Sequence, residues 1–250
     1  MRTLLGMIIA LIVLSSQVQA EDMNNYLSDT REMVHQGKHE EALERYIWFH
    51  DHALEHEPAM YGVRLSFALG YWKDLGDVYP PAKKALIETR DRKAHQIEMG
   101  EGNSSLFHDV SSLNETLEEG SKTIELFEYL DKENPKLAKQ CWNIAKDEVI
   151  DAKRFDLARK YMGNLVREFT RVKAAYDHDT TLYNDPKIGR MDFKAYSEDH
   201  FVEESLRLIE VAVALGDTTA ANEIQKKALA VVEDYRLRDA ITTEKKKDAQ

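Results

Sequence analysis

The sequence TIELFEYLDKENP, residues 123–135, carries the clearest pattern of a helix built to pack against a neighbouring helix. Thr123, Phe127 and Leu130 are spaced by four and three residues, which places them on one face of a helix. Pro135 follows, and the residue before a proline disfavours helical geometry, so the helix is expected to end there. A small side chain followed by two large apolar ones lets a neighbouring helix approach closely. The stretch therefore predicts one helix of a packed antiparallel pair.

Four other places along the chain carry a small residue in the same setting, early in the second helix of an expected pair. Apolar residues at spacings of three and four recur throughout, whereas the alternation typical of strands is almost absent. Gly and Pro residues fall where short turns between helices are expected. The chain is therefore predicted to be all-α. The small residues of the five expected pairs are Ala42, Ala82, Thr123, Ala158 and Ala221.

This arrangement resembles the tetratricopeptide repeat (TPR) family, whose unit is a helix pair of about 34 residues. The resemblance covers most of residues 23–240, although only Thr123–Pro135 keeps the family spacing through the terminal proline. It implies an α-solenoid of helix-turn-helix pairs whose first helices line a concave groove for peptide segments or partner helices. The interval from Ala158 to Ala221 exceeds one unit. Residues 170–200 are therefore expected to form an irregular insertion, which makes the solenoid irregular toward the C-terminus.

The register of the small residues projects a set of side chains onto that groove, and the set is mixed and somewhat acidic. It favours a basic or neutral extended segment, since gripping a C-terminal carboxylate would require several basic residues. The expectation is a non-catalytic interaction or scaffold module without a cofactor, which binds a protein or peptide; self-association is a further alternative. Each of these residues would also suit an ordinary solvated helix surface. The candidate groove residues are Lys73, Asp74, His108, Glu115, Asn143, Asp147 and Asp151.

A metal-site motif supplies the alternative function. Residues 52–56, HALEH, match H-x-x-E-H, the inverted zincin pattern. On a helix, His52 and His56 lie one turn apart and could hold Zn²⁺, with Glu55 as general base and a distant carboxylate such as Glu133 as third ligand. The families that use this motif surround it with a mixed α/β domain, and no strand pattern accompanies it here. A solvated helix face is therefore favoured over an exported helical zinc-dependent hydrolase.

Residues 1–20 are expected to be a signal peptide. Arg2 gives a positive start, residues 4–14 form an uncharged run, and Val18 and Ala20 fit a signal-peptidase site. The run is shorter than the roughly 20 residues that cross a bilayer as a helix, so retention as a membrane anchor is the weaker alternative. The chain is therefore expected to be exported, periplasmic or secreted, with cleavage after Ala20 and no stable membrane anchor afterwards.

Composition limits the remaining classes. The chain of 250 residues has a net charge of -11, which argues against sequence-independent binding of nucleic acid, because that requires clustered Lys and Arg. The single cysteine, Cys141, excludes an internal disulfide and is expected to be a small buried hydrophobe. Residues 21–241 are expected to form one TPR-like domain. Residues 242–250 would follow as a charged tail that frays.

Overall fold

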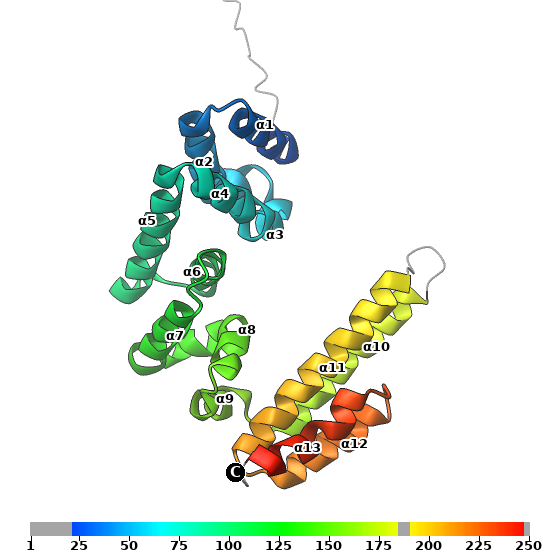
Figure 1. Ribbon diagram of the computed structural model, residues 1–250. Coiled ribbons are helices and arrows are strands. Elements are labelled where there is room, and N and C mark those ends of the chain that lie inside the picture. The colour runs from blue at the N-terminus through cyan, green and yellow to red at the C-terminus, as the bar shows by residue number, and fades with distance from the viewer. Residues whose placement is uncertain (1–21, 185–190, 248–250) are drawn as a thin grey trace, which may run out of the picture. The chain divides into compact units, whose positions relative to one another are not determined.

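The computed structural model describes residues 22–184 and 191–247, and over these residues the chain is helical with no strand (Figure 1). This confirms the predicted all-α class. The signal peptide predicted at residues 1–20 lies outside the described residues. The helices divide into two compact units, with the boundary between Thr89 and Arg90 inside one helix.

In the first unit, α4 packs closely against the start of α5, and both helices contribute to its apolar core. Trp72 is buried and donates its indole N–H to the carbonyl oxygen of Ala82 at 3.0 Å. Gly76 lies inside α4 rather than in a turn, and a Cβ there would come within 3.1 Å of the Lys83 backbone nitrogen. Glycine at this position therefore favours the close approach of these helices. The elements are α1 (Met23–His35), α2 (His39–His56), the 3-10 turn η1 (Pro58–Met60), α3 (Tyr61–Leu65), α4 (Phe67–Val78) and the start of α5 (Pro80–Gln96).

The second unit contains the stretch that predicts the fold. Helix α7 covers it and ends at Glu133, and Pro135 begins the next helix, which confirms the predicted boundary. Phe127 is fully buried among aromatic rings. The elements after α5 are the π-helical turn η2 (Ile97–Glu101), α6 (Ser104–Thr116), α7 (Ser121–Glu133), α8 (Pro135–Asp151), α9 (Phe155–Met162), α10 (Leu165–Tyr183), α11 (Met191–Ala214), α12 (Thr218–Leu229) and α13 (Tyr235–Lys247).

Short polar side chains begin four helices of the second unit. In each case an Asn or Asp oxygen accepts a hydrogen bond from the backbone N–H three residues later, at 2.8 to 3.1 Å. The first backbone N–H groups of a helix have no partner within the helix, so such a side chain stabilises the start by about 1 kcal/mol. The capping residues are Asn103, Asn134, Asn164 and Asp217.

Residues 170–200, expected to be an irregular insertion, are helical over 170–183 and 191–200, and Asn184 is the turn residue that ends the first of these helices. They belong to α10 and α11, which run side by side in Figure 1 and pack through Tyr176 and Phe201, whose ring centroids are 4.9 Å apart. The expectation of an irregular segment is wrong for these residues. The long interval between Ala158 and Ala221 is largely filled by these two long helices, and polar residues such as Asp177 and His178 occupy the exposed face of α10.

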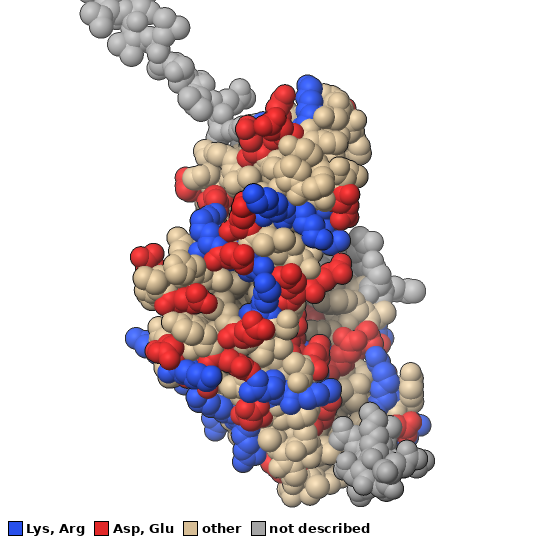
Figure 2. All heavy atoms as spheres, turned by 60° about the vertical axis from the view of Figure 1, so that its left-hand side comes forward, with Lys and Arg blue, Asp and Glu red and all other residues tan. Residues whose placement is uncertain are grey.

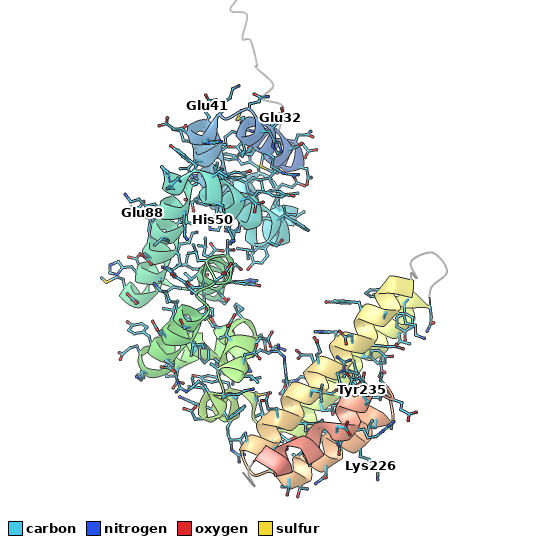
Figure 3. All side chains as sticks on the ribbon, viewed as in Figure 1. Glu32, Glu41, His50, Glu88, Lys226 and Tyr235 are labelled. Atoms are coloured by element: carbon cyan, nitrogen blue, oxygen red, sulfur yellow. The ribbon has the colours of Figure 1, made fainter. Side chains whose placement is uncertain are left out.

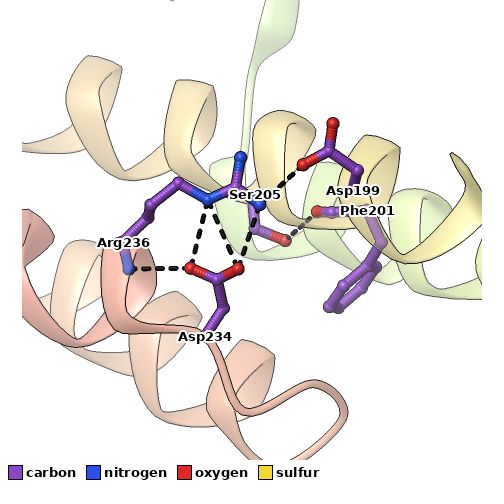
Figure 4. A network of polar contacts seen from close by, with 5 residues as sticks. All are labelled: Asp199, Phe201, Ser205, Asp234 and Arg236. Carbon is purple, nitrogen blue, oxygen red and sulfur yellow. Dashed lines mark hydrogen bonds and ion pairs between the residues drawn. The ribbon is translucent and has the colours of Figure 1, made fainter. Parts of the chain in front are cut away.

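Arg236, at the start of the C-terminal helix, forms an ion pair with α11 (Figure 4). Arg236 contacts Asp199 at 2.6 Å and Asp234 at 3.0 Å, and its hydrogen bond lowers the pKa of the Asp234 carboxyl. Ser205 donates to the carbonyl oxygen of Phe201 within α11. The backbone of α13 stays helical to Lys247, so most of the tail that was expected to fray continues the helix.

Cys141 lies on α8 and is fully buried in the core of the second unit. Burial raises the pKa of its thiol to about 12. The prediction that this cysteine is a small buried hydrophobe is confirmed.

In four of the turns between helices, one residue has a positive φ, in the left-handed region of backbone conformation. At each, that residue donates its N–H to the carbonyl three residues back, and the next residue donates to the carbonyl five residues back from itself. Each left-handed residue precedes one of the predicted small residues by five positions, and those small residues are buried. The turn near Ala82 differs, because Pro80 opens α5 directly after α4. The left-handed residues are Gly37, Glu118, Lys153 and Gly216.

A non-glycine residue in this conformation gives a test of the turn. Lys153 has a φ of 58° and forms an exposed ion pair with Glu210. Lys153→Gly and Lys153→Ala both remove the pair, but only alanine keeps the steric cost of positive φ. We expect the glycine variant to have the higher free energy of unfolding, by about 1 kcal/mol, in chemical denaturation followed by circular dichroism. Equal stabilities of the two variants would contradict the left-handed turn.

Candidate functional site

Three of the predicted groove residues lie along one exposed stripe of α8. Asn143, Asp147 and Asp151 are four residues apart, and all three side chains are exposed. Arg207 of α11 reaches this stripe, with its Nη1 atom 2.7 Å from Asp147 Oδ1 and 3.8 Å from Asp151 Oδ1. The stripe is therefore a polar surface beside α11.

Glu115, a fourth predicted groove residue, interacts with this surface through Glu148 of α8, whose carboxyl was not among the predicted site residues. Burial raises the pKa of Glu148, and the negative charges of Asp151, Glu115 and Asp147 raise it further, while Arg207 opposes the shift. Glu115 belongs to α6, so two helices contribute carboxyls to one place. We call Glu115, Asp147, Glu148 and Asp151 the acidic cluster.

Close packing holds the acidic cluster at a junction of helices. A Cβ on Gly120, just before α7, would lie 2.6 Å from Oε2 of Glu148, so the absence of a side chain there makes room for this carboxyl. On the other side, Lys146 of α8 contacts Glu204 of α11 at 2.7 Å. The cluster therefore rests on a framework of packed helices rather than on a loop.

The other predicted groove residues do not all lie in the same unit. Lys73 and Asp74 lie on α4 of the first unit, where Asp74 is exposed and Lys73 is half-buried. His108 is half-buried on α6, two turns before Glu115. The surface of the second unit thus contains only part of the set that the repeat register projected.

The residues of the zinc motif lie on α2. His52 Nδ1 is 3.1 Å from Glu55 Oε1, and both side chains are largely exposed. The rings of His52 and His56 lie 5.6 Å and 5.2 Å from that of Trp48. Glu133, the suggested third ligand, belongs to the second unit. Within residues 22–184 and 191–247, no group of three or more His, Cys, Asp or Glu side chains is arranged to hold a metal ion.

A buried polar network in the second unit was not predicted. Lys93 of α5 contacts Asp109 of α6 at 2.8 Å, with both side chains almost fully buried. Arg90 donates to Asn114 at 2.8 Å, and Asn114 in turn donates to the hydroxyl of Thr123 at 3.0 Å. This last bond gives a reason for threonine, rather than alanine, at the small position of α7. In the sequence these residues look like ordinary polar helix positions.

His50 is a polar residue of α2 that lies in the core of the first unit. Its side chain is buried, its ring meets that of Trp72 edge-on at 6.2 Å, and its carbonyl oxygen accepts a hydrogen bond from Arg64. Figure 3 shows His50 among the helices of the first unit, whereas Glu41 extends outward. The polar end of α2 therefore begins after His50.

The surface carries both signs of charge. On the face shown in Figure 2, acidic and basic side chains are interspersed. Across the described residues, every helix is too short or too polar to span a bilayer.

These features define an all-helical protein in two compact units, the second of which carries an acidic surface cluster. A scan against protein-family models, a search of curated proteins and a search of solved structures each find no match.

Proposed function

We propose that this chain is an exported, non-catalytic protein-interaction module of TPR-like type, which binds an extended basic segment at the acidic cluster. The observation that carries the proposal is the convergence of carboxyls from α6 and α8, which raises the pKa of Glu148. Like charges held together cost free energy unless cations compensate them, and Arg207 and Lys146 are the cations beside Asp147, at 2.7 and 4.0 Å. A basic partner would relieve the remaining repulsion.

Recurring geometry supports the TPR-like part of the proposal. Four helix-helix turns share the same left-handed position and the same two backbone hydrogen bonds. The small residues that the repeat register identified are all buried. Such recurrence is the expected mark of a chain built from similar helix pairs.

The spacing of the carboxyls indicates how a segment would lie. Asp147 and Asp151 are one helical turn apart, about 6 Å along α8. Alternate side chains of an extended peptide point the same way and repeat at about 6.6 Å. A segment running along α8 with basic residues at alternate positions would therefore match both carboxylates, with Asn143 as a polar contact one turn earlier.

A peptide of alternating Lys and Ala, ten residues long, tests the proposal by calorimetry at low salt. We expect it to bind more tightly than a peptide with the same residues in two blocks, and a Glu-Ala peptide not to bind. The double variant Asp147→Asn/Asp151→Asn should weaken binding about fivefold, and added salt should weaken it further.

The matched control is Glu223→Gln/Glu233→Gln, which removes two exposed carboxylates from the same unit. This variant has the same net charge as the test variant, so it separates a site from general attraction to an acidic protein. Equal binding of the Lys-Ala peptide to both double variants, or no binding to the unaltered chain, would overturn the proposal.

A further inference from the structure

A cavity of about 230 Å³ lies between α10 and α11, with one residue of α8 at its edge. None of the acidic-cluster residues lines it, so it is separate from the site proposed above. Its walls combine apolar side chains with a few polar groups, which is the usual make-up of a small-ligand site. The lining residues include Lys146, Val172, Tyr176, Asp179, Ser197 and Phe201.

Ser197 is the first sign that the cavity has an occupant. Its side chain is 1% exposed, and its Oγ atom has no hydrogen-bond partner among the described residues. A buried hydroxyl without a partner is unfavourable, and such groups are uncommon in folded proteins. A ligand with an N–H group in the cavity would satisfy this oxygen.

Charge decides what kind of ligand fits. The Lys146 ammonium is compensated by Glu204, which also lines the cavity, at 2.7 Å. Asp179 forms no ion pair with any residue that the structure describes, so the described lining carries one carboxylate without an ion-pair partner, beside the imidazole of His200. The cavity therefore favours a cation over an anion.

Aromatic rings add to this preference. Tyr176 and Phe201 contact each other with centroids 4.9 Å apart, and both line the cavity. Ring faces attract ammonium and guanidinium groups, most strongly where water is excluded. Val172 supplies an apolar wall against which a short hydrocarbon chain can pack.

We propose that this cavity binds a small organic cation: an ammonium or guanidinium group on a short aliphatic chain. The cation faces Asp179, an N–H donates to Ser197, and the chain lies against Val172 and the aromatic rings. A free alkyl diamine and a Lys or Arg side chain of a bound peptide share this chemistry.

Calorimetry with the purified chain and 1,5-diaminopentane tests the cavity. We expect saturable binding of the diamine and none of the neutral 1,5-pentanediol. Asp179→Asn should weaken diamine binding at least about tenfold, because it removes a charge-assisted contact. Ser197→Ala should weaken it about threefold. The control is Asp177→Asn, on the same helix but outside the lining and paired with Lys173, which should leave the affinity unchanged.

A second variant blocks the cavity without changing its charge. Ala175 lines the cavity, so Ala175→Phe should fill part of it and abolish diamine binding, while circular dichroism shows an intact helical fold. Absence of diamine binding, equal binding of the diol, or an affinity insensitive to Asp179→Asn would overturn the inference.

The Lys-Ala peptide distinguishes the two sources of the cation, a free amine and a side chain of a bound peptide. If Asp179→Asn weakens binding of both diamine and peptide, the cavity takes a partner's side chain. If it weakens only the diamine, the cavity takes a free amine. A peptide that binds through Asp147 and Asp151 while the diamine fails to bind would overturn the cavity inference alone. Diamine binding without peptide binding would overturn the proposed function alone.

Discussion

Lys93→Ala is expected to lower the free energy of unfolding of the second unit by about 3 kcal/mol or more. Lys93 and Asp109 are 2.8 Å apart and both side chains are 8% exposed. Removing the ammonium takes away the cation that compensates a buried carboxylate, and water cannot replace it without opening the packing of α5 on α6. Chemical denaturation followed by circular dichroism measures the loss.

Two further variants distinguish the effect of losing a buried ion pair from that of losing an exposed one, and show whether the remaining buried charge causes the loss of stability. Lys84 lies on the same helix and forms an exposed pair with Glu88, so Lys84→Ala should change stability by less than about 0.5 kcal/mol. Replacing both buried partners, as Lys93→Met/Asp109→Leu, should recover much of the stability lost in Lys93→Ala, since no buried charge is left. A Lys93→Ala variant as stable as Lys84→Ala would show that the pair is not buried in solution.

Phe127→Ala is expected to cost about 3 to 5 kcal/mol of stability. Phe127 is fully buried, and its ring contacts those of Phe107, Trp142 and Tyr161 at centroid distances of 6.3, 5.8 and 5.1 Å. Truncation removes apolar burial, leaves a cavity and ends three aromatic contacts at once. The loss is measured by chemical denaturation in the same way.

Two substitutions serve as controls for Phe127→Ala. Phe127→Leu keeps most of the volume and should cost less than half as much. Phe67 is 65% exposed in the first unit, so Phe67→Ala should change stability by less than about 0.5 kcal/mol. If Phe127→Ala were as mild as Phe67→Ala, α7 would not pack as the structure describes.

The parts of the fold that the sequence predicts are those encoded locally. The spacing of Thr123, Phe127 and Leu130 predicted α7 because helical periodicity is visible within a few residues. Pro135 predicted its end for the same reason. All five small residues are buried, since close helix contact leaves no room for larger side chains at those positions.

The predictions that were wrong or missing are those that depend on which helices pack against each other. The interval from Ala158 to Ala221 suggested an irregular insertion because its length alone does not distinguish a loop from two long helices. Lys93 and Asp109 are distant in sequence, so nothing local marks them as a buried pair. Ser197 likewise looks like any serine on a helix until its surroundings are known.

The candidate site was predicted only in part. Glu115, Asp147 and Asp151 follow from the register of the small residues. Glu148 was missed because its side chain becomes important only when α6 brings Glu115 close to it.

The single thiol gives the second unit a natural reporter. Alkylating reagents react with the thiolate, and at neutral pH burial keeps Cys141 protonated as well as shielded. Its labelling rate in the unaltered chain therefore measures how often α8 detaches from its neighbours, without any engineered probe and without interference from another cysteine.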